Sequence, residues 1–230
     1  MKKIPIGVDD FKKLIENNAY YIDKTKFIAD ILNDAAEVKL FTRPRRFGKT
    51  LNMSTFKYFF DIQNKDENRK LFNGLDIEKS QYISEQGKYP VIFISMKGIK
   101  APNWEDYLFQ IKTLIKELYN EFSFIREILN KSELDSFDKI WLKKDDGEYS
   151  NALKNLTAYL YKYYKKEVIL LIDEYDNPLI TAYEYHYYDD ALPFFKVFYG
   201  EALKTNPYLK MGVMTGIIRV IKAGIFSDLN

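Results

Sequence analysis

Three consecutive residues, Gly48, Lys49 and Thr50, are of the types that bind the phosphate chain of a nucleotide. They lie between an apolar run that predicts a strand, Val38–Thr42, and a stretch that predicts a helix. The N-terminus of a helix carries free backbone N–H groups and a partial positive charge, and both favour an anion. At such a junction Gly48 lets the backbone approach the phosphates, Lys49 reaches the β- and γ-phosphates, and the Thr50 hydroxyl ligates Mg²⁺.

The residues before this triplet depart from the usual phosphate-binding loop. The common pattern G-x-x-x-x-G-K-[ST] has glycine where this chain has Arg43, and the loop reads RPRRFGKT. Half of the chain's six arginines lie in this loop, and arginine suits bidentate phosphate contacts. We therefore expect the loop to face an anion, with a solvated basic turn as the alternative. The residues expected to bind nucleotide are Arg43, Pro44, Arg45, Arg46, Phe47, Gly48, Lys49, Thr50 and Leu51.

Two adjacent acids lie at the end of the hydrophobic run VILLID. Asp173 is the last residue of the run, and Glu174 follows it. Asp173 is expected to hold Mg²⁺ together with Thr50, and Glu174 to polarise an attacking water molecule. Acids also end buried strands without any chemical role, which is the alternative for this pair taken alone. A basic loop and an acidic pair, each following a predicted strand, together predict a nucleotide site.

Two residues near the end of the sequence complete the candidate catalytic set. Thr215 lies at the end of the apolar run KMGVMTG, where a polar side chain would sense the γ-phosphate. Arg219 follows four residues later and is expected to reach the phosphates or the site of a neighbouring subunit. An ordinary strand-end hydroxyl and a surface cation are the alternatives. The expected catalytic residues are Glu174, Lys49, Thr215 and Arg219.

Four short apolar runs are expected to form the sheet that positions these residues. Each run is almost continuously apolar, which is typical of parallel strands covered on both faces. The predicted strands are Val38–Thr42, Val91–Met96, Val168–Asp173 and Lys210–Gly216. The predicted helices are Lys49–Asp61, Trp104–Leu129, Ala152–Tyr164 and Asp190–Leu203, with shorter helices expected within 64–88 and 131–150. This alternation predicts a doubly wound α/β layer. Together with the loop and the acidic pair, it leads us to expect a P-loop NTPase fold, a three-layer sandwich with a mainly parallel sheet flanked by helices.

Composition narrows the class of protein further. The 230 residues suit one α/β domain spanning 1–230, and the abrupt ending GIFSDLN suggests the N-terminal part of a longer protein. A net charge of +2 gives no reason to expect nucleic-acid or membrane binding by this domain alone. The chain has no cysteine and one histidine, which excludes thiolate chemistry and disfavours a histidine metal site. The N-terminus lacks the apolar core of a signal peptide, so we expect a cytoplasmic protein.

Four segments of the chain resemble, in order, the bacterial AAA-ATPase-like family. They are IGVDDFKKLIENNAYYIDKTKFIADIL, LFTRPRRFGKTLNMSTFKYFF, VILLIDEYDNPL and MTGIIRVIKAGIFSDLN. The resemblance covers essentially the whole chain, and RPRRFGK[ST] is the family's own form of the loop. It implies a P-loop ATPase that uses Mg²⁺. It also implies a following nuclease-like domain of the PD-(D/E)XK type, absent from this chain, through which nucleic acid would be reached.

Two details of the resemblance bear on single residues. The family pattern near the end is commonly F-S-G-L-N-N, and Asp228 replaces its glycine, which leaves any role of that turn in doubt. The block YIDKT, from Tyr21 to Thr25, precedes the loop strand and is expected to cover the base or ribose. A segment that merely packs over the sheet edge is the alternative.

These observations favour Mg-dependent ATP binding with slow hydrolysis that serves as a conformational switch. ATP is preferred over GTP because, in the segment NKDE, Glu67 stands where the guanine-reading motif requires aspartate. Arg45 is expected to contact phosphate or to act in trans, which leaves an oligomer open. The alternatives are a nucleotide-gated interaction module that does not hydrolyse ATP, and the ATPase subunit of a nuclease-linked protein.

Overall fold

The sheet consists of four parallel strands in the order β1-β4-β3-β2. The computed structural model describes residues 4–218. The strands are β1 Val38–Thr42, β2 Val91–Ser95, β3 Val168–Asp173 and β4 Leu209–Gly216. The predicted parallel sheet is therefore confirmed, with each strand bounded within one residue of its expected range. All six residues of β3 are buried, as a central strand covered on both faces requires.

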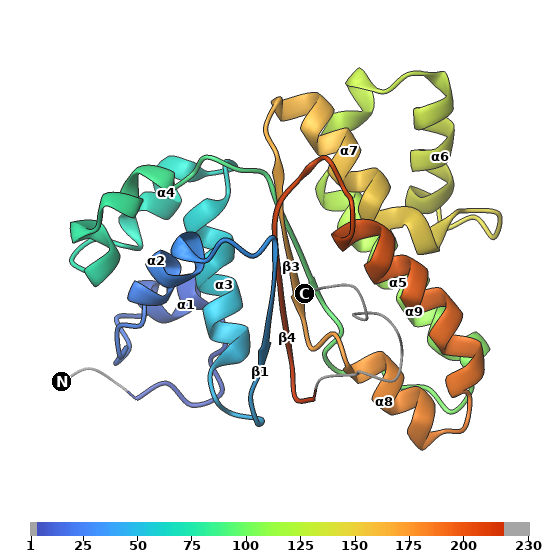
Figure 1. Ribbon diagram of the computed structural model, residues 1–230, viewed down its shortest axis with the longest axis horizontal. Helices are drawn as coiled ribbons and strands as arrows, with labels where there is room; N and C mark the ends of the chain where they lie inside the picture. The colour runs from blue at the N-terminus through green and yellow to red at the C-terminus, as the bar shows by residue number, and fades with distance from the viewer. Residues whose placement is uncertain (1–3, 219–230) are drawn as a thin grey trace.

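Helices cover both faces of this sheet (Figure 1). One layer comprises α1 Phe11–Glu16, α2 Lys26–Asn33, α3 Lys49–Phe60 and α4 Lys65–Lys70. The other comprises α5 Trp104–Glu121, α6 Lys131–Trp141, α7 Ala152–Tyr164, α8 Asn177–Glu184 and α9 Tyr188–Leu203. Short 3-10 helices lie at Asp76–Lys79, Gln81–Glu85, Ser123–Ile128 and Tyr149–Asn151. The expected three-layer P-loop-like architecture is thus present.

Side chains of β3 alternate between the two cores that these layers enclose. Ile169 and Leu171 belong to the core beneath α3, whereas Leu170 and Ile172 belong to the core beneath α5, α7 and α9. Alternate strand residues point to opposite faces of a sheet, so one apolar strand supplies both cores. At roughly 1.5–3 kcal/mol for each fully buried aliphatic side chain, β3 is a major source of the sheet's stability.

One predicted helix was too long. The expected helix Trp104–Leu129 ends at Glu121, and a 3-10 helix follows at Ser123–Ile128. The run that begins at Phe122 combines aromatic and β-branched residues with a serine, which are weaker helix formers than leucine, lysine or glutamate. The side chains of Phe122 and Ile125 are buried, so packing favours the tighter turn over another α-helical turn.

The strand register brings the carboxyl ends of all four strands to one edge of the sheet. Phe41 of β1 lies opposite Thr215 of β4, and Ser95 of β2 lies opposite Asp173 of β3. This edge is at the lower end of the sheet in Figure 1, where α3 and α8 begin. No helix within residues 4–218 has the length and apolar character needed to cross a membrane.

Candidate functional site

The loop between β1 and α3 contains two residues with left-handed backbone conformation. Arg46 has φ +68° and Gly48 has φ +75°. Gly48 directly precedes α3, and a side chain other than glycine's would be strained there. A Cβ atom placed on Gly48 would meet no atom within 4 Å, so the backbone is open to a ligand at this point. The N-terminus of a twelve-residue helix therefore faces accessible space, as anion binding requires.

The Lys49 side chain turns back over the loop that precedes it. Its ammonium group donates hydrogen bonds to the carbonyl oxygens of Arg43, at 2.8 Å, and Pro44, at 2.9 Å. Lys49 thereby fixes the curvature of the loop and keeps a positive charge at its centre. A phosphate oxygen is a stronger acceptor for an ammonium than a neutral carbonyl oxygen, so an incoming phosphate competes well for this side chain.

Asp173 is fully buried at the end of β3 and accepts hydrogen bonds from three hydroxyl groups. Thr50 donates to its Oδ2 at 2.9 Å, Ser95 donates to the same oxygen at 3.3 Å, and Thr215 donates to Oδ1. The three donors come from α3, β2 and β4. A buried carboxylate is costly unless it has such partners. The hydroxyls therefore satisfy the buried carboxylate and fix its orientation beside the loop.

Glu174 has a strained backbone and a perturbed carboxyl group. Its φ is +54°, which is uncommon for a residue other than glycine, and its N–H donates to Thr215 Oγ1 at 3.4 Å. Burial raises the pKa of Glu174, the negative charge of Asp173 raises it further, and Lys97 and Lys49 act in the opposite direction. Strain and a raised pKa at a residue facing a cavity are typical of functional sites.

A cavity of about 590 Å³, here called the loop cavity, lies between these groups. Its walls come from the N-terminal segment 7–9, from the loop and helix start, from the residues after β2, and from Glu174 with Asn177. The loop and helix start contribute Arg45, Arg46 and residues 48–51, and the residues after β2 are Lys97, Gly98 and Lys100. The cations that line it are Arg45, Arg46, Lys49, Lys97 and Lys100. The two acids that line it are Asp9 and Glu174. The excess of positive groups gives the loop cavity the electrostatic character of a polyanion site.

Arg43 and Phe47 do not line the loop cavity. Both line a different cavity, of about 250 Å³, whose wall includes Phe27 and Phe56. Arg43 also donates a hydrogen bond to the carbonyl oxygen of Thr42, at 3.1 Å. The sequence grouped all nine loop residues into one binding set, whereas the fold places Arg43 and Phe47 beside this second cavity and Lys49 between the two.

The block YIDKT lies beside the loop. Tyr21 and Lys24 line a third cavity, of about 250 Å³, together with Gly48 and Leu51. The same block also has a packing role, because the buried Thr25 donates to Asp23 at 2.7 Å. The segment therefore lies next to the loop. Its internal hydrogen bond is also consistent with a purely structural packing role.

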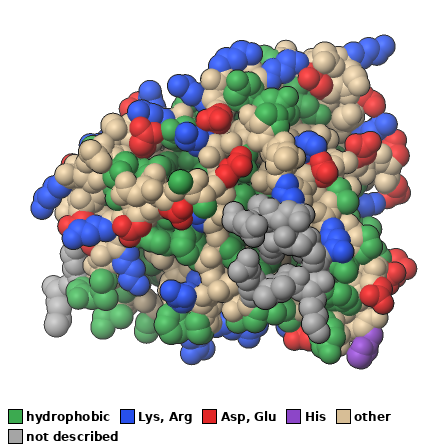
Figure 2. Space-filling model, viewed as in Figure 1, with side chains coloured by type: hydrophobic (Ala, Val, Ile, Leu, Met, Phe, Trp, Pro, Cys, Tyr) green, Lys and Arg blue, Asp and Glu red, His purple; other side chains and the backbone are tan. Residues whose placement is uncertain are grey.

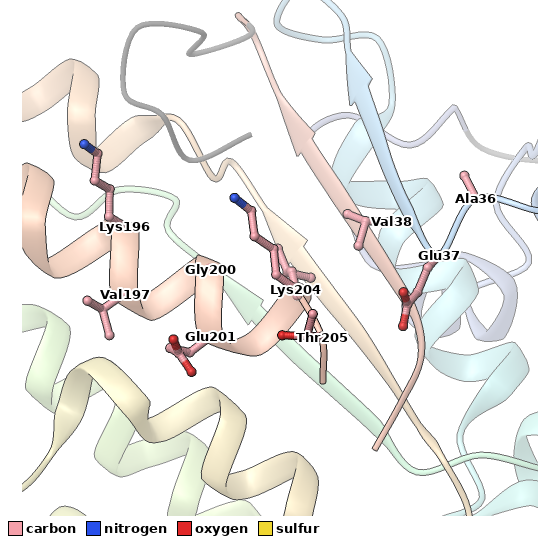
Figure 3. Close-up of a pocket in the computed structure, with 10 residues that line it drawn as sticks. Ala36, Glu37, Val38, Lys196, Val197, Gly200, Glu201, Lys204 and Thr205 are labelled. Atoms are coloured by element: carbon pink, nitrogen blue, oxygen red, sulfur yellow. The ribbon is translucent and has the colours of Figure 1, made fainter. Parts of the chain in front are cut away.

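A cavity larger than the loop cavity lies at the other end of the sheet, away from the acids and the loop (Figure 3). It encloses about 710 Å³ between the start of β1, at Glu37 and Val38, and the C-terminal half of α9. None of the predicted site residues lines this cavity. Size alone is therefore a poor guide to the functional site here.

Two residues near Asp173 and Glu174 were not predicted from the sequence. Ser95 ends β2, and its hydroxyl contacts Asp173, while Lys97 lines the loop cavity two residues further on. For Ser95, the only signal in the sequence was its position as a polar residue at the end of the apolar run VIFIS. Arg219 and Asp228 lie outside the described residues. Among residues 4–218 there is no cluster of three acidic or histidine side chains able to hold a metal.

Comparisons with known proteins identify a family for this chain. The family described as predicted AAA-ATPase matches residues 5–226. A curated relative from Azotobacter chroococcum mcd 1, described as an uncharacterized protein in the vnfD 5′ region, is 25% identical over 237 residues. The alignment covers 100% of this chain and only 40% of that relative's length. The comparison with solved structures found no match.

Proposed function

The chain belongs to the family of predicted AAA-ATPases, and from this premise we propose that it binds ATP with Mg²⁺ in the loop cavity and hydrolyses it slowly. The hydrogen bond between Thr50 and Asp173 carries this proposal. It joins the first turn of the helix after the phosphate-binding loop to the acidic end of β3. A metal ion bound to a nucleotide phosphate at the helix start would meet both side chains.

The positive groups of the loop cavity would bind the phosphates. Lys49 would exchange its hydrogen bonds to the loop carbonyl oxygens for bonds to the β- and γ-phosphates. The N–H groups at the start of α3 would face the same phosphate oxygens. Arg45 and Arg46 line the cavity and would add charge-assisted hydrogen bonds. Phe47 and Arg43 face the neighbouring cavity, so we assign them to the nucleotide's surroundings rather than to its phosphates.

The oxygen donors beside the loop fit Mg²⁺. Magnesium prefers oxygen ligands and is commonly held by one or two protein groups together with substrate phosphates and water. The Thr50 hydroxyl and the buried Asp173 carboxylate are such a pair, already 2.9 Å apart. When bound, the ion would neutralise charge on the phosphates. Because the described residues hold no three-carboxylate cluster, we expect Mg²⁺ to bind with the nucleotide rather than before it.

Glu174 would orient the water molecule that attacks the γ-phosphate. It directly follows Asp173, faces the loop cavity, and lies near Lys49. Thr215 would report the presence of the γ-phosphate, since its hydroxyl contacts both Asp173 and the backbone N–H of Glu174. Hydrolysis of this kind depends on positioning and electrostatics, so slow turnover by these residues alone is expected. ATP binding and loss would then switch the conformation around the loop.

Two variants test this proposal with fluorescent ATP and GTP analogues. Lys49→Ala should weaken ATP binding roughly 10- to 100-fold, the loss expected for a charge-assisted hydrogen bond. Glu174→Gln should keep ATP and Mg²⁺ bound and abolish phosphate release. Unchanged affinity in Lys49→Ala would overturn the site. If wild-type protein binds Mg-ATP and no phosphate release can be measured, the chain is a nucleotide-gated interaction module instead.

A further inference from the structure

Lys97 lies at the acidic edge of the sheet on the side opposite to the phosphate-binding loop. It follows β2, whereas Lys49 follows β1, and the strand order places Asp173 and Glu174 between them. The backbone N–H of Lys97 donates to Ser95 Oγ at 3.3 Å, and that hydroxyl in turn contacts Asp173. The Ser95 hydroxyl thus links the backbone of Lys97 to Asp173, the acid that we propose as a metal ligand.

The ammonium group of Lys97 already has an anionic partner from the N-terminal segment. It forms an ion pair of 2.5 Å with Asp9 Oδ2. About half of each side chain remains exposed, 55% for Lys97 and 50% for Asp9. Exposed ion pairs contribute little, typically about 0–1 kcal/mol. A triphosphate carries several negative charges and would therefore replace a single exposed carboxylate at this ammonium.

We propose that Lys97 is a second phosphate-binding cation, which exchanges Asp9 for the terminal phosphate of the bound nucleotide and thereby releases residues 7–9. This inference rests on the proposed function of the loop cavity. Lys97, Lys49, Glu174 and Asp9 all line that cavity. The arrangement places a cation on each side of the γ-phosphate position, so a nucleotide without this phosphate would contact Lys49 and leave Lys97 with Asp9.

The contacts of the N-terminal segment define how far such a release would extend. Asp10 caps α1 by accepting from the Lys13 N–H at 2.8 Å, and Tyr58 of α3 donates to its other oxygen at 2.9 Å. The Phe11 N–H donates to Ser54 at 2.8 Å in a buried contact. The Ser54 hydroxyl also donates to the carbonyl oxygen of Asp9 at 3.4 Å, so the backbone is held from that carbonyl onward, whereas the Asp9 side chain depends on Lys97. Loss of that ion pair would free the segment before Asp10 and keep α1 docked.

The first test compares the affinities of ATP and ADP analogues for the full chain and its variants. Lys97→Gln should weaken ATP binding about tenfold, the loss of one charge-assisted contact, and change ADP binding less than twofold. Asp9→Asn removes the competing carboxylate and should tighten ATP binding a few-fold. The double variant should have the same ATP affinity as Lys97→Gln, because in this proposal Asp9 affects ATP binding only by competing for Lys97. Lys97→Arg should restore most of the ATP affinity.

The outcomes separate this inference from the proposed function and from a structural role. If Lys49→Ala loses both nucleotides while Lys97→Gln binds ATP normally, the loop cavity is the site and the role of Lys97 is wrong. If both Lys97→Gln and Asp9→Asn weaken ATP binding alike, the pair only supports the fold, and the exchange is refuted. If wild-type protein binds neither nucleotide, the proposed function itself fails. Lys154→Gln, which breaks another exposed ion pair, with Glu201, is the matched control.

The second test measures hydrogen exchange of the backbone amides before Asp10. A non-hydrolysable ATP analogue should raise exchange at residues 7–9 in wild-type protein, and an ADP analogue should leave it unchanged. Lys97→Gln should show fast exchange with or without nucleotide. Slower exchange of this segment in the ATP complex would contradict the release and indicate closure over the nucleotide instead.

Discussion

The hydroxyl of Thr50 and the carboxylate of Asp173 are joined by a hydrogen bond of 2.9 Å, although 123 residues separate them in the sequence. The contact exists because β1 and β3 run parallel with β4 between them, so the loop after β1 and the end of β3 share one edge. The helix that begins after the loop carries Thr50 toward that edge. The fold thereby holds together the two groups that we propose as ligands of one metal ion.

This contact predicts a metal-specific defect in Thr50→Ala. The variant removes one proposed Mg²⁺ ligand, while Asp173 keeps its bonds from Ser95 and Thr215. We expect the affinity for Mg-ATP to fall about tenfold and the affinity for ATP without metal to change little, because the lost group contacts only the ion. Titration of a fluorescent ATP analogue with Mg²⁺ or with EDTA measures both.

Thr55→Val is the matched control for this prediction. Thr55 lies on the same helix, is buried, and donates to the carbonyl oxygen of Leu51 rather than to Asp173. Its substitution should leave the ratio of the two affinities unchanged. A Thr50→Ala protein that loses affinity equally with and without Mg²⁺ would argue that the hydroxyl contacts phosphate directly.

A second buried acid, Asp176, holds the chain that follows β4. It is 1% exposed, and its Oδ2 accepts from the N–H groups of Ile217, at 2.7 Å, and Ile218, at 2.9 Å. Asp176→Ala leaves both donors without this acceptor and should destabilise the fold by about 2–4 kcal/mol. Asp176→Asn retains an acceptor oxygen and should cost less. Urea denaturation provides the comparison, and equal losses in the two variants would show that the charge alone matters.

The strands and the loop were predictable from the sequence because their signals are local. The run Val168–Asp173 is continuously apolar, and the structure buries every residue of it. The helix Ala152–Tyr164 has its expected bounds, and Lys165 ends it with φ +52°. A continuous apolar run and a helical period both depend on neighbouring residues only, so one sequence suffices to read them.

The remainder of the site could not be read from local patterns. Ser95 and Lys97 reach the acidic edge only because β2 pairs with β3 in a register that places Ser95 opposite Asp173. Strand order and register depend on packing between distant segments. The separation of Arg43 from Arg45 has the same origin, since the turn of the loop directs their side chains into different cavities. Spacing in the sequence does not encode either relationship.

From the sequence, the distribution of charge over the folded protein was anticipated only for the arginines of the loop. The sequence has a net charge of +2, and Figure 2 shows acidic and basic side chains interspersed over the face in view. The clustering of five cations around the loop cavity arises instead from two separate segments, the loop with the start of α3 and the residues after β2. Near-neutral composition therefore coexists with a locally positive site.

A buried phenol provides a test of the core. Tyr107 is fully buried, and its hydroxyl has no hydrogen-bond partner within the described part of the chain. Tyr107→Phe removes an unsatisfied polar group and should stabilise the protein by about 1 kcal/mol. Tyr119 is equally buried, but its hydroxyl donates to the carbonyl oxygen of Ala152 at 2.9 Å. Tyr119→Phe should therefore destabilise by a similar amount, and thermal unfolding of both variants would reveal the opposite signs.

Stability should depend on pH through Asp61, which follows α3. Burial raises the pKa of this carboxyl group to about 6, and Glu121 acts in the same direction, while Lys57 and the Gln63 N–H oppose it. A raised pKa means that the folded state binds the proton more tightly than the unfolded chain, whose aspartate titrates near 4. The stabilisation from protonated Asp61 is complete below the unfolded pKa. It is lost as the pH rises through about 6.

Asp61→Asn should therefore raise stability at pH 8 by about 2 kcal/mol, allowing for the partial exposure of the side chain, and have almost no effect at pH 4. The amide oxygen can still accept from the Gln63 N–H, so the local hydrogen bond of 3.1 Å is kept. Glu117→Gln, at an exposed position of α5, serves as the control and should alter stability little at either pH. Urea unfolding at the two pH values gives the difference. A gain that is equal at pH 4 and pH 8 would show that Asp61 is not the titrating group.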